Sequence, residues 1–369
     1  MKKIAILTFH NAHNYGAMLQ AYALQKKCEE YGKCEILDYE NKKISNQYKI
    51  IRIVGKNPIN IIKRAVLDIK NYKKRKLRAE KFNNFMNGYM NLSLKRFKKE
   101  KNLKKEKIKY DILITGSDQV WNPQIVGGLS EIYTLNFGGN EIKRISYAAS
   151  VGDVNVISDN KEEFSKKLSN LNYISVREND AKDELQKIIN KDIEVVLDPT
   201  LLMSREEWNS EIISVNKCNQ KYIVAYVVEP DTEYIKIVNE LSRKTNLPVV
   251  YFEAKNPGYT NVLKSEYTAG PLEFVNYIKN AEYVVTTSFH ATVFSIIFNK
   301  KFFIIPHKKT GARVTTLLKK LEIDGRIFSN YDEFKTIDYD FETDWSIIEK
   351  KLKNEQDASI KWLKNAINE

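Results

Sequence analysis

The sequence predicts an α/β protein of two domains, each built on a parallel sheet covered by helices. Its 369 residues exceed the usual size of a single domain. Short β-branched runs alternate with longer helical patterns through both halves of the chain, which is typical of strand-helix-strand units. A hydrophobic content of 43%, with 11% aromatic residues, is enough for globular cores.

The first half begins with a predicted strand, which ends too early at His10 and Asn11 to be a signal peptide. A helix follows over Ala17 to Tyr31, where apolar residues recur at helical spacing. The remaining strands of this half are expected at Glu35 to Tyr39, Tyr110 to Thr115, Arg144 to Ala149, Tyr173 to Arg177 and Glu194 to Leu197. The first domain is therefore predicted over residues 1–205.

A second series begins after the apolar periodicity weakens between Ser204 and Gln220. Its predicted elements are strands at Tyr222 to Val228, Pro248 to Phe252 and Phe302 to Pro306, and helices at Glu233 to Thr245 and Pro271 to Asn280. We place the second domain at residues 217–340 and expect a final helix at 345–369 to pack across both domains.

The cysteines indicate a reducing, cytoplasmic environment and no structural metal, because Cys28, Cys34 and Cys218 are odd in number and form no Cys-x-x-Cys pair. No apolar run approaches the roughly 20 residues needed to cross a bilayer. The sequence also lacks a groove-reading motif or an aromatic platform for stacking bases, so nucleic acid is not an expected partner.

A basic insertion at residues 42–109 interrupts the first domain. It holds 23 Lys and Arg against four acidic residues, a local net charge of +19 in a chain of net charge +13. Apolar residues interleave with basic runs such as Lys73 to Lys76, which predicts amphipathic helices. These helices could contact an anionic membrane at its inner face, or they could simply present a solvated surface.

His290 follows a β-branched run and opens an apolar helix, so it lies where a strand enters a helix. Ser288 stands at the start of that helix, whose backbone N–H groups and dipole favour an anion. Histidine changes its charge near neutral pH, which suits acid catalysis there. The structural alternative is a capping serine followed by a packed histidine.

Two polar loops follow strands of the first domain. The loop at residues 10–17 includes His13, Asn14, Tyr15 and Gly16, and it can donate hydrogen bonds to a polyhydroxylated or anionic ligand, or simply cap the next helix. It lacks the Gly-x-Gly-x-x-Gly pattern of dinucleotide sites.

The second polar loop, at residues 115–123, offers Asp118 as a base or hydroxyl orienter and Trp121 as a surface on which a sugar ring stacks. The structural alternative for Asp118 is a helix cap.

Two arginines are candidate anion ligands. Arg177 ends a strand just before a helix, although an ion pair with Glu178 or Asp180 would use the same residue. Arg313 opens a helix after residues 310–312 and could either reach a ligand or be a solvated first-turn residue.

Six motifs in register resemble the polysaccharide pyruvyl transferase family. They are Asn14-Tyr15-Gly16 with Leu19-Gln20, Gly116 to Asn122, Ser146 to Ser150, Val176-Arg177-Glu178, Leu197 to Thr200, and Ser288-Phe289-His290. The resemblance covers the chain from about Ile4 to Arg326, apart from the basic insertion. It implies two Rossmann-like domains arranged as in B-type glycosyltransferases.

The resemblance also implies an enzyme that transfers a pyruvyl group from phosphoenolpyruvate, its donor substrate, to sugar hydroxyls. The acceptor would be a cell-surface polysaccharide or its lipid-linked oligosaccharide precursor, the product a pyruvate ketal, and no cofactor would be needed. His290 would act as general acid, and Ser288, Arg177 and Arg313 would hold the donor. Asp118 would act in catalysis, and His13 to Gly16 with Trp121 would bind the acceptor.

This chain departs from the family at one position that matters, because better-known members have an arginine two residues before the histidine and this chain has Ser288. Either Arg313 or another cation supplies that charge, or the donor differs.

Two alternatives to the pyruvyl transferase function remain open. They are a sugar-nucleotide-dependent glycosyltransferase and a non-catalytic glycan-binding or assembly protein.

Overall fold

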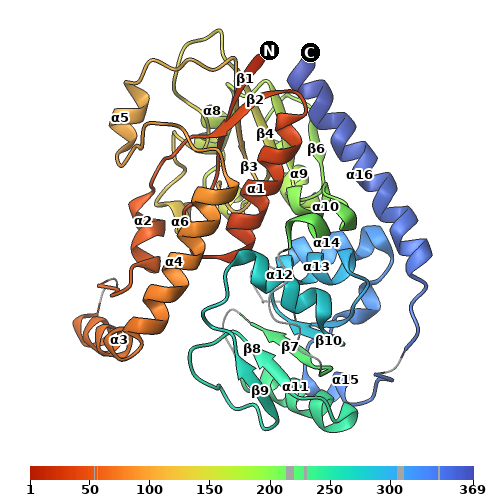
Figure 1. Cartoon of the computed structure of the whole chain (residues 1–369). Coiled ribbons are helices and arrows are strands. Elements are labelled where there is room, and N and C mark those ends of the chain that lie inside the picture. The colour runs from red at the N-terminus through yellow and green to blue at the C-terminus, as the bar shows by residue number, and fades with distance from the viewer. Residues whose placement is uncertain (54, 56, 213–219, 228–230, 306–310, 340) are drawn as a thin grey trace. The chain divides into compact units, whose positions relative to one another are not determined.

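The computed structural model describes residues 1–53, 55, 57–212, 220–227, 231–305, 311–339 and 341–369 (Figure 1). Cys218, Val228, Pro306 and Thr310, which figure in the predictions above, lie outside the described residues. The chain divides into two compact units. The first comprises residues 1–70, 83–203 and 353–369, and the second comprises residues 71–82 and 204–352.

The first unit contains a six-stranded sheet in the order β2-β1-β3-β4-β5-β6, in which every neighbouring pair is parallel. Its strands are β1 (Lys2–Leu7), β2 (Gly32–Ile36), β3 (Ile112–Gly116), β4 (Lys143–Ala149), β5 (Tyr173–Val176) and β6 (Ile193–Val195). Strand β3 is wholly buried, β4 is buried from Arg144 onward and β1 is buried from Ile4 onward, as expected for the interior of a parallel sheet.

The helices of the first unit connect these strands, and all of them except α3 supply buried residues to an apolar core against the sheet. They are α1 (Tyr15–Glu29), α2 (Lys42–Ser45), α3 (Pro58–Lys70), α5 (Glu100–Lys104), α6 (Pro123–Val126), α7 (Asn155–Ser158), α8 (Lys161–Leu168) and α9 (Asn179–Gln186). Helix α1 is buried along nearly its whole length, so it lies beneath other elements of the first unit.

The second unit contains a five-stranded sheet in the order β11-β10-β7-β8-β9, again with every neighbouring pair parallel. Its strands are β7 (Ile223–Tyr226), β8 (Val249–Tyr251), β9 (Val262–Ser265), β10 (Tyr283–Thr286) and β11 (Lys301–Ile304). Its helices are α10 (Arg205–Glu211), α11 (Thr232–Thr245), α12 (Pro271–Asn280), α13 (Phe289–Ile297), α14 (Ala312–Leu321) and α15 (Tyr331–Phe334). The α/β fold class with two parallel sheets is therefore confirmed.

The basic insertion is helical, as predicted, but it is not confined to the first unit. Residues 71–82 of helix α4 (Tyr72–Tyr89) belong to the second unit, where Lys81 forms an ion pair with Glu273 at 2.6 Å and the guanidinium of Arg78 donates to the carbonyl of Tyr267. The end of the insertion runs beside β2 through two parallel bridges, Ile36 with Leu92 and Tyr39 with Phe97.

The final helix, α16 (Trp345–Asn368), is also divided between the units. Its first half contacts the second unit, where Glu349 pairs with Arg205 at 2.6 Å. Its second half contacts the first unit, where the hydroxyl of Ser359 accepts a hydrogen bond from the backbone N–H of Leu197. Within the part of the chain that is described, no helix is both long enough and apolar enough to cross a membrane.

Candidate functional site

Each sheet has one point at which the order of its strands reverses, and ligands of parallel α/β sheets bind beyond the carboxyl ends of the strands there. In the first sheet this point lies between β1 and β3, and in the second it lies between β7 and β10. The two polar loops predicted from the sequence follow β1 and β3, and the His290 segment follows β10. The topology therefore brings the predicted motifs to two sheet edges, one in each unit.

The loop after β1 contains one buried histidine and one partly exposed histidine. The Nδ1 atom of His10 lies 3.2 Å from the carbonyl of Thr8, and its Nε2 atom lies 3.2 Å from the carboxylate of Asp38. This side chain is fully buried and bonded at both nitrogens, so its role is structural. His13 is only half-buried, and its ring centroid lies 5.9 Å from that of Tyr48.

The other predicted acceptor residues of this loop begin helix α1. The side chain of Asn14 caps the helix by accepting a hydrogen bond from the backbone N–H of Ala17 at 3.2 Å. Tyr15 and Gly16 form the first turn and are buried. Of these four predicted acceptor residues, His13 and Asn14 are the two that keep accessible surface.

The loop after β3 turns sharply at Gly116. Its φ is +144°, and a Cβ atom at this position would lie 1.9 Å from the carbonyl oxygen of Tyr147. Asp118 follows with φ of +64°, a left-handed conformation that aspartate tolerates better than most residues. One carboxylate oxygen of Asp118 accepts a hydrogen bond from the N–H of Gln119, and the side chain keeps accessible surface. Asp118 therefore caps no helix and remains available to a ligand.

Trp121 belongs to the core of the first unit. Its indole is fully buried, and its Nε1–H donates to the carbonyl of Tyr133 at 3.1 Å. Stacking on a sugar ring needs an exposed indole face, so the structure gives no support to the predicted acceptor role of Trp121. The sequence shows this residue in a polar loop but not the direction of its side chain.

Arg177 lies in a buried polar network after β5. Its Nη1 atom donates to the carboxylate of Asp198 at 2.6 Å, and its Nε atom lies 3.9 Å from Glu178. The same Asp198 carboxylate accepts from the hydroxyls of Ser117 at 2.9 Å and Thr200 at 2.6 Å. The charge of Arg177 is therefore balanced inside the protein, chiefly by Asp198 rather than by Glu178 or Asp180, the partners that the sequence suggested.

His290 lies in the first turn of α13, directly beyond the carboxyl end of β10. The preceding Ser288 caps the helix, since its hydroxyl accepts a hydrogen bond from the N–H of Ala291 at 3.5 Å. His290 is 7% exposed, and its ring meets that of Phe289 edge to face, with centroids 5.2 Å apart. The predicted strand-to-helix junction is confirmed.

Arg313 lies beside this junction. Its guanidinium carbon is 5.9 Å from the ring centroid of Phe289, the residue between Ser288 and His290. Arg313 comes from α14, which contacts α13 in the same unit. The guanidinium of Arg313 thus lies near the start of α13. At this helix start the chain has Ser288, where better-known members of the family it resembles have an arginine.

Glu253 was not predicted as a site residue, although it also follows a strand of the second sheet. Burial raises the pKa of its carboxyl group from an ordinary 4.5 to about 7. The Oε2 atom accepts a hydrogen bond from the N–H of Phe252, whereas the buried Oε1 atom has no hydrogen-bond partner among the described residues. The sequence could have indicated Glu253 as a site residue, because it directly follows the predicted strand over Pro248 to Phe252.

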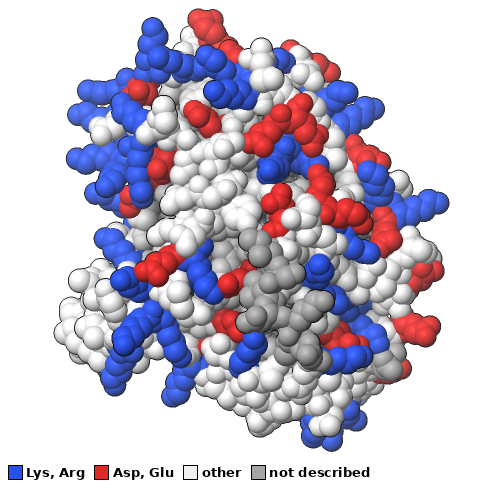
Figure 2. Space-filling model, in the orientation of Figure 1, with Lys and Arg blue, Asp and Glu red and all other residues white. Residues whose placement is uncertain are grey.

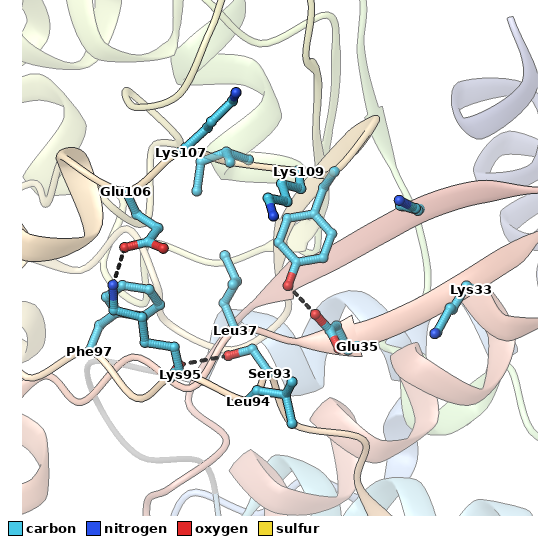
Figure 3. A pocket seen from close by; sticks show the side chains of 13 residues that line it. Lys33, Glu35, Leu37, Ser93, Leu94, Lys95, Phe97, Glu106, Lys107 and Lys109 are labelled. Atoms are coloured by element: carbon cyan, nitrogen blue, oxygen red, sulfur yellow. Dashed lines mark hydrogen bonds and ion pairs between the residues drawn. The ribbon is translucent and has the colours of Figure 1, made fainter.

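A pocket of about 360 Å³ lies beside β2 in the first unit (Figure 3). It is lined by Lys3 of β1, by Lys33 and Glu35 of β2, by Leu37 just beyond that strand, and by residues between 93 and 110 at the end of the basic insertion. Figure 3 shows the ion pair of Lys95 with Glu106 and the hydrogen bond of Tyr110 to Glu35 across it. None of the candidate site residues described above lines it, so this pocket is distinct from the candidate site.

The described residues include no group of three His, Cys, Asp or Glu side chains arranged to hold a metal ion. Cys28 and Cys34 are buried and unbridged. The side-chain contact with Cys28 and burial both raise the pKa of the Cys34 thiol, which makes it a poor nucleophile.

Comparison with known proteins identifies one family. Residues 14–309 match the family described as polysaccharide pyruvyl transferase. None of the curated proteins compared with the chain is significantly similar to it.

Several solved structures are similar in fold. The UDP-GlcNAc 2-epimerase from Neisseria meningitidis bound to UDP-GlcNAc aligns with 11% identity and a TM-score of 0.48, over 96% of this chain and 100% of that one. A putative UDP-N-acetylglucosamine 2-epimerase from Listeria monocytogenes aligns with 11% identity and a TM-score of 0.49, over 97% of this chain and 90% of that one. A spinosyn rhamnosyltransferase aligns with 8% identity and a TM-score of 0.46, over 100% of both chains. Similarity at this level says nothing about the activity of this chain.

Proposed function

Because this chain belongs to the polysaccharide pyruvyl transferase family, and is thus a transferase, we propose that it moves the pyruvyl group of phosphoenolpyruvate onto two hydroxyls of one sugar. The product is a pyruvate ketal, and inorganic phosphate is released. The acceptor is a sugar of a cell-surface polysaccharide or of its lipid-linked precursor. The proposal needs no cofactor beyond the donor itself.

The reaction needs one proton donor and a hydroxyl nucleophile. A proton added to the methylene carbon of phosphoenolpyruvate creates the methyl group and an oxocarbenium-like carbon. The first sugar hydroxyl attacks this carbon and loses its proton. Phosphate then leaves with cleavage of its bond to carbon, and the second hydroxyl attacks and loses its proton to close the ketal. Of the two protons released, one replaces the proton given to the methylene carbon and the other ends on the departing phosphate as hydrogen phosphate.

His290 is the proton donor in this proposal. The observation that carries the assignment is its position in the first turn of α13, at the strand-order reversal of the second sheet, with Arg313 near the preceding Phe289. Backbone N–H groups of the first helical turn and the guanidinium of Arg313 attract the phosphate and carboxylate of the donor.

The acceptor side of the proposal rests on the first unit. His13, Asn14 and Asp118 keep accessible surface at the reversal point of the first sheet. The carboxylate of Asp118 is suited to orient or deprotonate a sugar hydroxyl, and His13 and Asn14 supply hydrogen bonds. Trp121 and Tyr15 have no part in this proposal because both are buried.

Phosphate release tests the proposal directly. The full-length protein is incubated with phosphoenolpyruvate and a panel of soluble and lipid-linked sugars, with and without EDTA. We expect acceptor-dependent phosphate release that EDTA does not abolish and that the His290→Gln variant lacks. Release of a nucleoside diphosphate from a sugar nucleotide, with none from phosphoenolpyruvate, would show a glycosyltransferase instead. Acceptor binding with neither release would contradict catalysis.

A further inference from the structure

Helix α3 exposes the side that a globular protein normally buries. Its residues Ile59, Ile62, Val66 and Ile69 are 63%, 64%, 46% and 59% exposed. They recur at intervals of three and four, so they share one face of the helix. Scattered apolar residues on a surface are ordinary, but a stripe along a whole helix marks an interaction surface.

An ion pair between buried Asp68 and partly exposed Arg52 fixes this orientation. Asp68, which is 2% exposed, accepts hydrogen bonds from Nε of Arg52 at 3.0 Å, from Nη2 of Arg52 at 2.7 Å and from the backbone N–H of Arg52 at 2.9 Å. At 100° per residue, Asp68 lies on the face opposite Ile59. Asp68 is thus held inward, and Ile59, Ile62 and Ile69 face outward as a consequence.

The surroundings of the apolar stripe are basic. Lys63 and Lys70 are exposed and lie next to the stripe on the helix surface. They belong to the insertion whose local net charge is +19. Figure 2 shows an uncharged surface where Figure 1 places α3, with Lys and Arg side chains beside it. An apolar face with flanking cations matches the boundary between acyl chains and anionic headgroups.

We propose that α3 docks on an anionic lipid bilayer, lying in the plane of the headgroups with Ile59, Ile62, Val66 and Ile69 among the upper acyl chains. A second copy of the chain is a poorer occupant. A two-fold contact through this stripe would bring Lys63 and Lys70 close to their own copies, which repel each other. The proposal is independent of pyruvyl transfer, and it assigns the membrane contact to α3 rather than to the run from Lys73 to Lys76, in which Arg75 donates to the hydroxyl of Tyr267.

Vesicle flotation of the full-length protein tests whether α3 binds a bilayer. The assay contains neither phosphoenolpyruvate nor a sugar acceptor. We expect the wild type to float with phosphatidylcholine vesicles that contain phosphatidylglycerol, and binding to weaken at least tenfold between 50 and 500 mM salt. The Ile62→Asn/Ile69→Asn double variant should bind at least tenfold more weakly. Both side chains are already exposed, so this change should leave the fold and the phosphate-release activity on a soluble acceptor intact.

The control is Ile347→Asn, which makes the same change at an isoleucine that is 52% exposed in α16. It should bind vesicles as the wild type does. Failure of the wild type to float at 50 mM salt would overturn the proposal, as would unchanged flotation of the double variant. Sedimentation showing a wild-type dimer that the double variant converts to a monomer would assign the stripe to self-association instead.

Discussion

An ion pair in the first unit and a single carboxyl group in the second lie beyond the carboxyl ends of sheet strands, and they offset the free-energy cost of burial in different ways. In the first unit, Arg177 and Asp198 neutralise each other, and Ser117 and Thr200 bond to the same carboxylate. In the second unit, Glu253 stays largely buried without an ion pair among the described residues, and its pKa rises to about 7. Pairing makes a rigid structural centre, whereas a displaced pKa leaves a group that changes charge near neutral pH.

The largest expected effect tests the structural side of this comparison. Arg177→Ala leaves the Asp198 carboxylate buried without its cation and should lower the free energy of unfolding by about 3–5 kcal/mol. Urea denaturation of the purified protein measures this loss. The control is Lys182→Ala, which breaks the more exposed pair with Glu194 and should cost less than about 1 kcal/mol. Equal stability of both variants would mean that Arg177 has no structural role.

The second effect concerns His290 in the other unit. His290→Gln should lower the rate of phosphate release about a hundredfold or more, because a positioned general acid contributes at least that much. Circular dichroism and thermal unfolding check that the variant is folded. The control is Ser295→Ala in the same helix, whose hydroxyl bonds to the carbonyl of Ala291. Turnover near the wild-type value in folded His290→Gln would remove the histidine from the mechanism.

The third effect asks whether Arg313 supplies the cation missing at Ser288. Arg313→Ala should weaken donor binding by roughly 1.5–3 kcal/mol, the range for a hydrogen bond to a charged group. Isothermal titration calorimetry with phosphoenolpyruvate measures this change. Lys319→Ala, at an exposed position on the same helix, should leave the affinity unchanged. If Arg313→Ala binds the donor as tightly as the wild type does, another cation must hold it.

The smallest effect is a pH dependence of stability. The folded pKa of Glu253, about 7, exceeds its ordinary value of 4.5, so the folded state binds more protons than the unfolded state between these values. The free energy of unfolding should therefore fall as pH rises from about 4.5 to 7, by roughly 1–3 kcal/mol from this group. Denaturation curves at several pH values measure this fall. Glu253→Gln should flatten it, and a variant with the wild-type slope would assign the effect to other groups.

The sequence predicted the sheets well because their strands are short, apolar and β-branched. The helix over Pro271 to Asn280 was predicted with its observed bounds. Helix α10 was missed although Ser204 and Glu207 form a capping box, which is a recognisable signal for a helix start. Strand β9 was missed because it is a short, partly exposed edge strand with little apolar pattern.

The candidate site was predictable in position but not in detail. A polar residue after a parallel strand must lie at the carboxyl edge of its sheet, and this places Asp118 and His290 correctly. Whether such a residue faces a ligand depends on contacts with distant parts of the chain. Arg177 pairs with Asp198, 21 residues later, and Trp121 turns into the core, and neither outcome leaves a local pattern in the sequence.

The turn at Gly116 affects how a mutational scan of the loop from 116 to 122 should be interpreted. Any larger residue at 116 would place its first carbon atom 1.9 Å from the carbonyl oxygen of Tyr147, so nearly every substitution there displaces β3 from β4. Position 118 has a left-handed backbone that asparagine and glycine also adopt, and it would accept those two changes without such damage. Loss of function on substitution of Gly116 therefore reports the spacing of β3 and β4. Loss of function in Asp118→Asn would instead report a chemical role of the Asp118 carboxylate.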